Sequence, residues 1–224
     1  MIVIAIEIAY MASSRVIYHY PDLTLAEVEM LRTPLRLFAA LAFWLLMADV
    51  IFSRERNLRP LRRPLVVVGL VLAFASATIV GADDQPLYDT IVICLATISV
   101  GVHEEIFFRG ILQTLLVSRF GLVPGIGLMV SLFVGFHIGV TPDNFLNFTN
   151  IALAGLLLGL LYAGTGSLLA VVVFHTLYDT LASSPDILSF IPLSWVTPTL
   201  ALGTWLVAIG TRAARPRRVG PNHD

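Results

Sequence analysis

The stretch "LYDTIVICLATISVGVHEEIFFRGILQTLLVS", residues 87–118, is apolar over a greater length than one membrane crossing requires. A helix needs about 20 apolar residues to cross a bilayer. Four ionisable side chains nevertheless lie within seven residues of it, namely His103, Glu104, Glu105 and Arg109. A charged side chain at mid-membrane costs roughly 2.5–3.5 kcal/mol on insertion scales, so this cluster predicts a functional site inside a membrane helix.

The rest of the chain shares this apolar character. Of its 224 residues, 57% are hydrophobic and only 13% are charged, and the mean hydropathy is +0.87. Soluble domains have about 25% charged residues. The composition therefore predicts an all-α, polytopic transmembrane helical bundle, an integral multi-pass protein whose surroundings are the lipid bilayer.

Apolar segments separated by glycine and proline predict about eight membrane spans. The first span is weak, because Glu7 and Arg15 interrupt it. We expect a single bundle over residues 1–210, followed by a basic cytoplasmic tail at 211–224. The expected spans are 2–20, 34–52, 64–82, 87–118, 122–140, 147–163, 166–184 and 187–210.

The charge distribution predicts an orientation. All fourteen basic residues are arginines, and most of them lie at 53–63 and 211–218. Basic clusters beside apolar spans are typical of cytoplasmic flanks, so we expect no nucleic-acid partner. The acidic connections 81–86 and 140–144 then lie outside. The wealth of arginine and absence of lysine are typical of a GC-rich bacterial genome. We expect the protein in the bacterial inner (cytoplasmic) membrane.

Helical spacing organises the opening cluster. Glu105 and Arg109 are i,i+4 with the glutamate first, which is the favourable order for an ion pair. Glu104 is rotated about 100° from Glu105 and faces a different neighbour. One carboxylate is thus neutralised by arginine, while the other is left for chemistry.

Two later spans carry further polar groups. His137 lies in the 122–140 span, and His175 and Asp179 lie i,i+4 on one face of the 166–184 span. A carboxylate can fix the tautomer of an imidazole. If these side chains converge with Glu104 in one cavity, they form a site that can activate water.

Three motifs in this order resemble the CAAX-protease and bacteriocin-processing family of Rce1-type intramembrane endopeptidases. They are Glu-Glu-x-x-x-Arg at 104–109, Phe-x-x-x-His at 133–137 and His-x-x-x-Asp at 175–179, and the resemblance covers about residues 87–184. It implies hydrolysis of a peptide bond of a membrane-tethered or exported protein or peptide.

Residue by residue, the resemblance implies that Glu104 activates water and that His137 helps to hold it. It also implies that His175 and Asp179 support the oxyanion and that Glu105 and Arg109 brace the helix. The third motif ends in Asn or Asp in this family. An ionised Asp179 cannot donate a hydrogen bond, so it either stays protonated or orients His175.

Two alternatives remain open at this stage. Glu104, His137 and His175 could form a zinc shell, but the zincin motif His-Glu-x-x-His is absent, so we expect a glutamate-type protease without a cofactor. Intramembrane carboxylates and histidines also build proton relays. The rival function is therefore a non-enzymatic transporter or immunity protein with the same bundle.

The remaining polar residues have unremarkable expectations. His103 is expected to face a loop or a polar pocket. Asn147 and Asn150 lie near an outer loop and are expected to meet water. Trp44, Trp195 and Trp205 are expected to anchor the bundle at the membrane interfaces.

Overall fold

The structure is a computed structural model, which describes residues 2–52, 63–80, 87–139, 145–182 and 193–212. These residues form helices and contain no strand, which confirms the predicted helical bundle. The helices are α1 (Ile2–Tyr18), α2 (Leu25–Phe52), α3 (Arg63–Val80), α4 (Leu87–Glu104), η1 (Glu105–Gln113), α5 (Thr114–Phe120), α6 (Leu122–His137), α7 (Phe145–Thr165), α8 (Leu168–Ala182), η2 (Leu193–Trp195) and α9 (Val196–Arg212).

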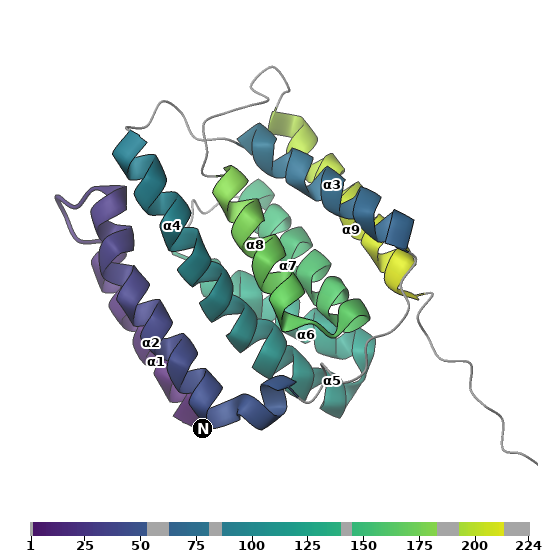
Figure 1. Cartoon of the computed structure of the whole chain (residues 1–224), viewed down its shortest axis with the longest axis horizontal. Coiled ribbons are helices and arrows are strands. Elements are labelled where there is room, and N and C mark those ends of the chain that lie inside the picture. Colours follow the sequence, from purple (N-terminus) through teal and green to yellow (C-terminus); the bar gives the residue numbers. More distant parts are fainter. Residues whose placement is uncertain (1, 53–62, 81–86, 140–144, 183–192, 213–224) are drawn as a thin grey trace, which may run out of the picture.

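The helices are arranged around α4 and α8 (Figure 1). The α1–α2 pair packs on one side of α4, and α8 packs on the other. The α3–α9 pair forms the opposite flank of the bundle, where α9 contacts α7 and α3 contacts α8. The segment from α4 to α8 therefore lies between two outer pairs of helices.

The long apolar stretch of the sequence is one continuous helical rod that changes its winding midway. The α-helix α4 continues directly into the π-helix η1 and then into α5. Thr114 Oγ1 also donates to the carbonyl of Arg109, five residues earlier, at 3.2 Å. π-helical turns inside α-helices are frequently found at functional sites.

Helix α2 begins nine residues before the predicted start at residue 34. The reason is a capping box: the Thr24 amide donates to Glu27 at 2.8 Å, and the Glu27 amide donates to Thr24 Oγ1 at 3.3 Å. Pro34 lies inside the helix, and the backbone is non-helical at Met47 (φ −133°, ψ 20°), where the helix kinks.

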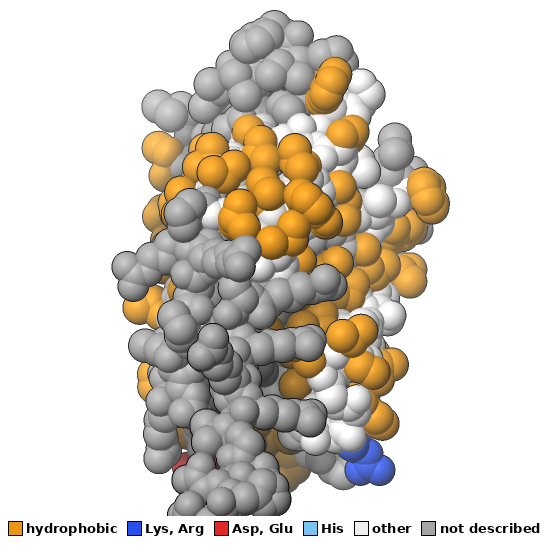
Figure 2. Space-filling view, turned by 90° about the vertical axis from the view of Figure 1, so that its right-hand side faces the viewer, with side chains coloured by type: hydrophobic (Ala, Val, Ile, Leu, Met, Phe, Trp, Pro, Cys, Tyr) orange, Lys and Arg blue, Asp and Glu red, His pale blue; other side chains and the backbone are white. Residues whose placement is uncertain are grey.

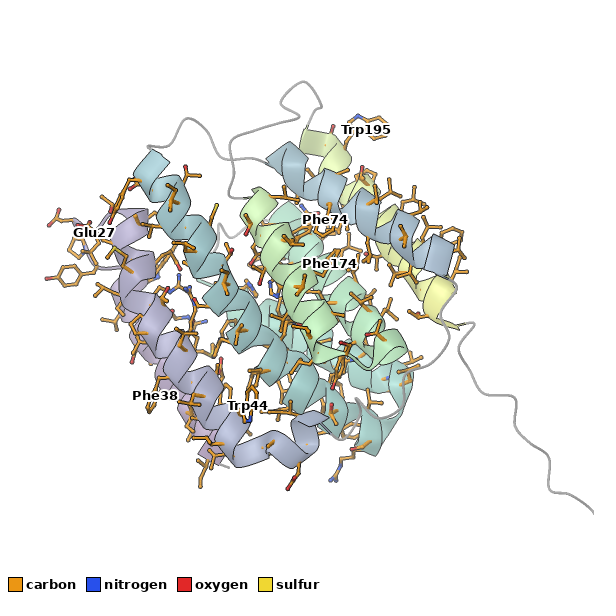
Figure 3. All side chains as sticks on the ribbon, in the orientation of Figure 1. Glu27, Phe38, Trp44, Phe74, Phe174 and Trp195 are labelled. Atoms are coloured by element: carbon orange, nitrogen blue, oxygen red, sulfur yellow. The ribbon has the colours of Figure 1, made fainter. Side chains whose placement is uncertain are left out.

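Two glycines allow α3 and α9 to pack closely. A Cβ added at Gly69 would lie 2.6 Å from the carbonyl oxygen of Gly203, and the reverse substitution gives the same distance. Such small-residue contacts are typical of helix pairs in membranes. Beside this contact, Phe74 of α3 and Phe174 of α8 point toward each other, with ring centroids 4.6 Å apart (Figure 3).

Apolar side chains cover much of the described surface on the side that carries α3 and α9 (Figure 2). Trp44 and Trp195 are more than half exposed and lie toward opposite ends of the bundle, as expected of interface anchors (Figure 3). Trp205 is also exposed, at 57%.

By length and composition, three described helices could each cross a membrane, namely Leu25–Ile51, Tyr88–Phe120 and Asn147–Thr165. Four shorter apolar helices accompany them, at Leu65–Ala77, Leu122–His137, Leu168–Ala182 and Val196–Thr211. The count of eight crossings stays a prediction. The expected loops 81–86 and 140–144, and most of the basic cluster and of the basic tail, lie outside the described residues.

Candidate active site

The cluster of four ionisable residues within 87–118 is buried where α4 passes into η1. Glu105 and Arg109 are fully buried, and Glu104 is only 7% exposed. The ion pair expected from the i,i+4 spacing is present, since Arg109 Nη1 lies 2.8 Å from Glu105 Oε1. One carboxylate is thus neutralised within its own helix, and the adjacent one is not.

Arg109 also joins η1 to two neighbouring helices. Its Nη2 donates to the carbonyl of Gly155 in α7 at 3.2 Å, and its guanidinium lies over the ring of Phe133 in α6 at 4.6 Å. One turn further along, Gln113 Nε2 donates to the carbonyl of Gly159 at 2.8 Å. The glycine pair Gly155–Gly159 therefore receives two polar side chains of η1.

His175 of α8 lies between three carboxylates. Its Nδ1 is 2.6 Å from Glu105 Oε1, its Nε2 is 3.3 Å from Asp179 Oδ2, and the same Nε2 is 4.0 Å from Glu104 Oε2. The sequence assigned the orienting role to Asp179. In the structure, the shortest contact that fixes the ring comes from Glu105, on another helix.

His137 is fixed by its own helix. Its Nδ1 lies 2.8 Å from the carbonyl oxygen of Phe133, one turn earlier in α6. A carbonyl oxygen only accepts hydrogen bonds, so Nδ1 carries the proton. In this tautomer the lone pair of the neutral ring is on Nε2.

All four residues with a predicted catalytic role line one cavity of about 500 Å³. They come from three different helices: Glu104 from α4, His137 from α6, and His175 with Asp179 from α8. Glu105 and Arg109 do not line this cavity and lie behind it. The rest of the wall is largely apolar and includes Leu157, Leu158, Phe174, Val196 and Leu200.

Two asparagines that were expected to meet water, Asn147 and Asn150, line the same cavity. Asn147 and Asn150 are three residues apart, which places them on one face of α7. Asn150 Oδ1 accepts from Thr197 Oγ1 of α9 at 2.7 Å. The i,i+3 spacing of the two asparagines was the signal in the sequence that they share one face of a helix.

His103 is fully buried and does not face a loop. Its Nε2 lies 3.1 Å from Oε2 of Glu7 in α1, and its ring packs on Tyr10 at 4.3 Å. Glu7, which interrupts the first apolar segment of the sequence, is therefore matched by a partner 96 residues away. The pair ties α1 to the turn that precedes Glu104.

The described residues contain no group of three or more His, Cys, Asp or Glu side chains arranged to hold a metal ion. The set that could have formed a zinc shell, Glu104, His137 and His175, shares the cavity without forming such a group. His175 is engaged by Glu105 and Asp179 instead.

Comparison with known families agrees with the motifs. Residues 86–181 match the family model described as "Type II CAAX prenyl endopeptidase Rce1-like". The matched segment contains α4, η1 and α5 to α7, and nearly all of α8. No curated protein and no solved structure matches the chain. The match confirms the predicted resemblance, implies a protease acting on a membrane-associated peptide, and together with the apolar helices indicates an integral membrane protein.

Proposed function

We propose, from the match of residues 86–181 to the Rce1-like family model, that the chain is a glutamate-type intramembrane endopeptidase. It hydrolyses a peptide bond of a membrane-tethered or exported protein or peptide, in the bacterial inner membrane. One observation carries the proposal: Glu104, His137, His175 and Asp179 line one cavity, although they come from three helices.

Glu104 is the base that activates water. No hydrogen bond within the described residues engages its buried Oε2, while the neighbouring Glu105 is held by Arg109 and His175. The two adjacent glutamates thus have different roles. Glu105 is a fixed structural anion, and Glu104 can accept a proton from a water in the cavity and pass it to the leaving amine.

His175 supplies a donor to the oxyanion that forms when water adds to the peptide carbonyl. Carboxylates accept only, so Glu105 at Nδ1 and an ionised Asp179 at Nε2 together stabilise a ring that is protonated on both nitrogens. A donor on Nε2 at the cavity wall can then shift to the developing oxyanion. Asp179 in this account orients His175 and does not itself donate.

His137 holds the water. Its Nδ1 is bound to the carbonyl of Phe133, so Nε2 of the neutral ring accepts a hydrogen bond. The apolar wall of the same cavity suits the side chains of an apolar peptide segment. We place the mouth of the cavity toward the outer face. The connection 140–144, just before α7, is predicted to lie outside, and two residues of the cavity wall lie at this end of the bundle: Asn147 near the start of α7 and Asp179 near the end of α8.

The test is cleavage of lipidated peptides by purified protein in liposomes, read by mass spectrometry in ¹⁸O water. Wild type is expected to give a product with ¹⁸O in its new carboxyl group. Glu104→Ala and His137→Ala should each abolish the product, whereas Asp22→Asn, a carboxyl-to-amide change at an exposed position, should not. Continued processing by both alanine variants would refute the protease and favour the transporter or immunity protein.

A further inference from the structure

Helix α1 lies outside the segment that matches the family model, so the match says nothing about its role. Two of its ionisable side chains, Glu7 and Arg15, interrupt an apolar part of the sequence. Glu7 is only 3% exposed. An ionisable side chain among apolar helices is unfavourable unless specific partners compensate for it. The partners of these two side chains therefore indicate what α1 does.

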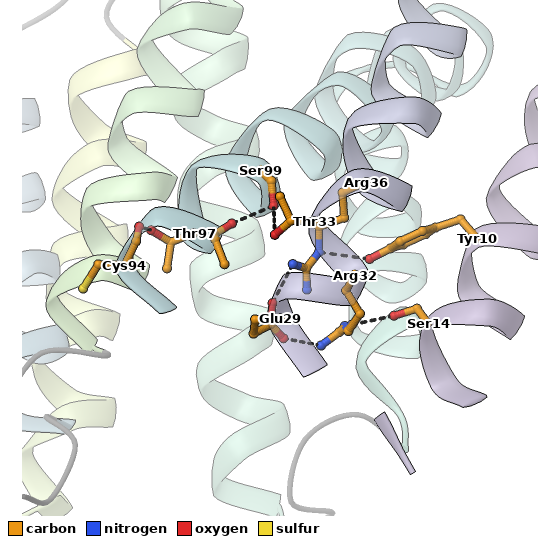
Figure 4. A network of polar contacts seen from close by, with 10 residues as sticks. Tyr10, Ser14, Glu29, Arg32, Thr33, Arg36, Cys94, Thr97 and Ser99 are labelled. Carbon is orange, nitrogen blue, oxygen red and sulfur yellow. Dashed lines mark hydrogen bonds and ion pairs between the residues drawn. The ribbon is translucent and has the colours of Figure 1, made fainter. Parts of the chain in front are cut away.

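Helix α1 is attached to α2 by a network of polar contacts (Figure 4). Arg32 Nε of α2 donates to Ser14 Oγ of α1 at 2.7 Å. Arg36 Nε of α2 donates to the Tyr10 hydroxyl of α1 at 3.2 Å. Glu29 accepts from both arginines at 2.6 Å and thereby fixes the two guanidiniums. The α1–α2 pair is therefore one support on which other helices can be positioned.

In its first half, α1 contacts the residue that precedes Glu104. Glu7 Oε2 lies 3.1 Å from Nε2 of His103, which is fully buried. The imidazole also packs on the rings of Tyr10 in α1 and Phe43 in α2, with centroids 4.3 and 5.8 Å away. The α1–α2 pair thus holds His103, whose backbone continues directly into Glu104.

At its other end, α1 contacts the backbone that follows His137. Arg15 Nη2 donates to the carbonyl oxygen of Ile138 at 2.8 Å, and His19 Nε2 lies 3.1 Å from the carbonyl oxygen of Gly139. The last carbonyls of a helix have no partner within it, and cationic donors are favourable at that end. Helix α1 thus closes the C-terminal end of α6, immediately after His137.

We propose that Glu7 and Arg15 are positioning residues, through which α1 fixes the placement of Glu104 relative to His137. The inference rests on the proposed function. The two site residues come from different helices but must reach the same water, and a misplacement of about 1 Å can cost about 10²-fold in rate. Glu7 and Arg15 are eight residues apart, about 12 Å along one rigid helix. That helix holds the neighbours of both site residues.

The spacing of α4 and α6 can be measured directly by pulsed electron paramagnetic resonance. In a Cys94→Ala background, spin labels are attached at Ile98→Cys on α4 and Leu132→Cys on α6, since both side chains are about half exposed. Glu7→Leu and Arg15→Met each remove one contact of α1. Each should shift or broaden the distance distribution by about 1 Å or more.

Peptide hydrolysis is the second readout, at a temperature where every variant is folded. Glu7→Leu and Arg15→Met should lower kcat about tenfold or more and leave KM near its wild-type value, because the contacts act on the reacting groups and not on peptide binding. Glutamine can still accept from His103, and lysine can still donate to the carbonyl of Ile138. Glu7→Gln and Arg15→Lys should therefore recover most of kcat.

Arg32→Met is the matched control. Arg32 is also bound to α1, but its described hydrogen bonds are to Ser14 and Glu29, within the α1–α2 pair. The control should lower the unfolding temperature and leave both kcat and the distance distribution unchanged. An equal effect of Arg32→Met on kcat would overturn the inference, since α1 would then act only through overall stability.

The two readouts separate this inference from the proposed function. If the wild type cleaves the peptide while Glu7→Leu or Arg15→Met retains both kcat and the distance distribution, the positioning role is wrong and the protease stands. If both variants change the distance but the wild type hydrolyses no peptide, α1 positions α4 and α6 as inferred, and the protease is refuted.

Discussion

Oε1 of Glu105 lies 2.6 Å from Nδ1 of His175 and accepts a hydrogen bond from Nη1 of Arg109 at 2.8 Å. This single buried oxygen thus joins α8 to η1, and it contacts both the imidazole of His175 and the guanidinium of Arg109. The adjacent Glu104 makes no comparable contact among the described residues, its nearest charged neighbour being His175 Nε2 at 4.0 Å. This contrast between two consecutive glutamates leads to opposite expectations for the same substitution.

Glu105→Gln should destabilise the protein. Removing one partner of a buried ion pair leaves an uncompensated charge and costs on the order of 3 kcal/mol. Glu104→Gln breaks no described hydrogen bond and loses only a 4.0 Å contact with His175, so it should cost much less stability than Glu105→Gln. Thermal unfolding of both variants in detergent measures the difference, and equal loss of stability in the two would contradict the distinction.

The glycine of α7 that faces Phe133 should be intolerant of alanine. A Cβ at Gly155 would lie 2.9 Å from Cδ1 of Phe133, whose carbonyl holds His137. Overpacking of this kind costs typically 1–3 kcal/mol. Gly155→Ala should therefore lower both stability and peptide cleavage.

Gly127→Ala is the control for that substitution. Nothing lies within 4 Å of a Cβ at Gly127, and alanine stabilises a helix relative to glycine by up to about 1 kcal/mol. The control should retain full cleavage and equal or higher stability. If Gly155→Ala behaved like the control, the close packing of α7 on Phe133 would not matter to the site.

Metal removal should leave the activity unchanged. The described residues contain no group of three ligands, and His175 is engaged by Glu105 and Asp179. Peptide cleavage is measured before and after dialysis against 1,10-phenanthroline. A metalloprotease would instead be established if cleavage were lost and then restored by added zinc, but not by washing out the chelator alone.

The orientation predicted from the arginine clusters can be read by cysteine labelling. In a Cys94→Ala background, Phe145→Cys reports the exposed start of α7, and Ser118→Cys reports the opposite end of the bundle in α5. An impermeant maleimide applied to intact cells should label position 145 and not position 118. The reverse pattern would place the cavity mouth toward the cytoplasm.

Much of the fold could be predicted from the sequence, because each apolar segment is long enough to be recognised on its own. The differences have local causes. Helix α2 starts at Leu25 because Thr24 and Glu27 form a capping box, a signal that is present in the sequence but weaker than Pro34. The π-helix η1 has no signature in its composition, and its Arg109 and Gln113 side chains donate to carbonyls of α7, which is 46 residues away in the sequence.

For the site, spacing within one helix was informative and pairing between helices was not. The Glu105–Arg109 pair follows from i,i+4 geometry, and so does the proximity of His175 to Asp179. The pairing of Glu105 with His175 spans 70 positions and depends on how α8 packs on η1. The same limit applies to Glu7 and His103, which are 96 positions apart.

The measurement closest to the central claim is peptide hydrolysis by Glu104→Gln under conditions where its unfolding temperature matches that of the wild type. Loss of a general base lowers the rate by about 10²–10⁴-fold. We predict that kcat falls by at least about 10²-fold while KM for the peptide stays near its wild-type value. A folded Glu104→Gln protein that cuts the peptide at the wild-type rate would contradict the assignment of Glu104 as the residue that activates water.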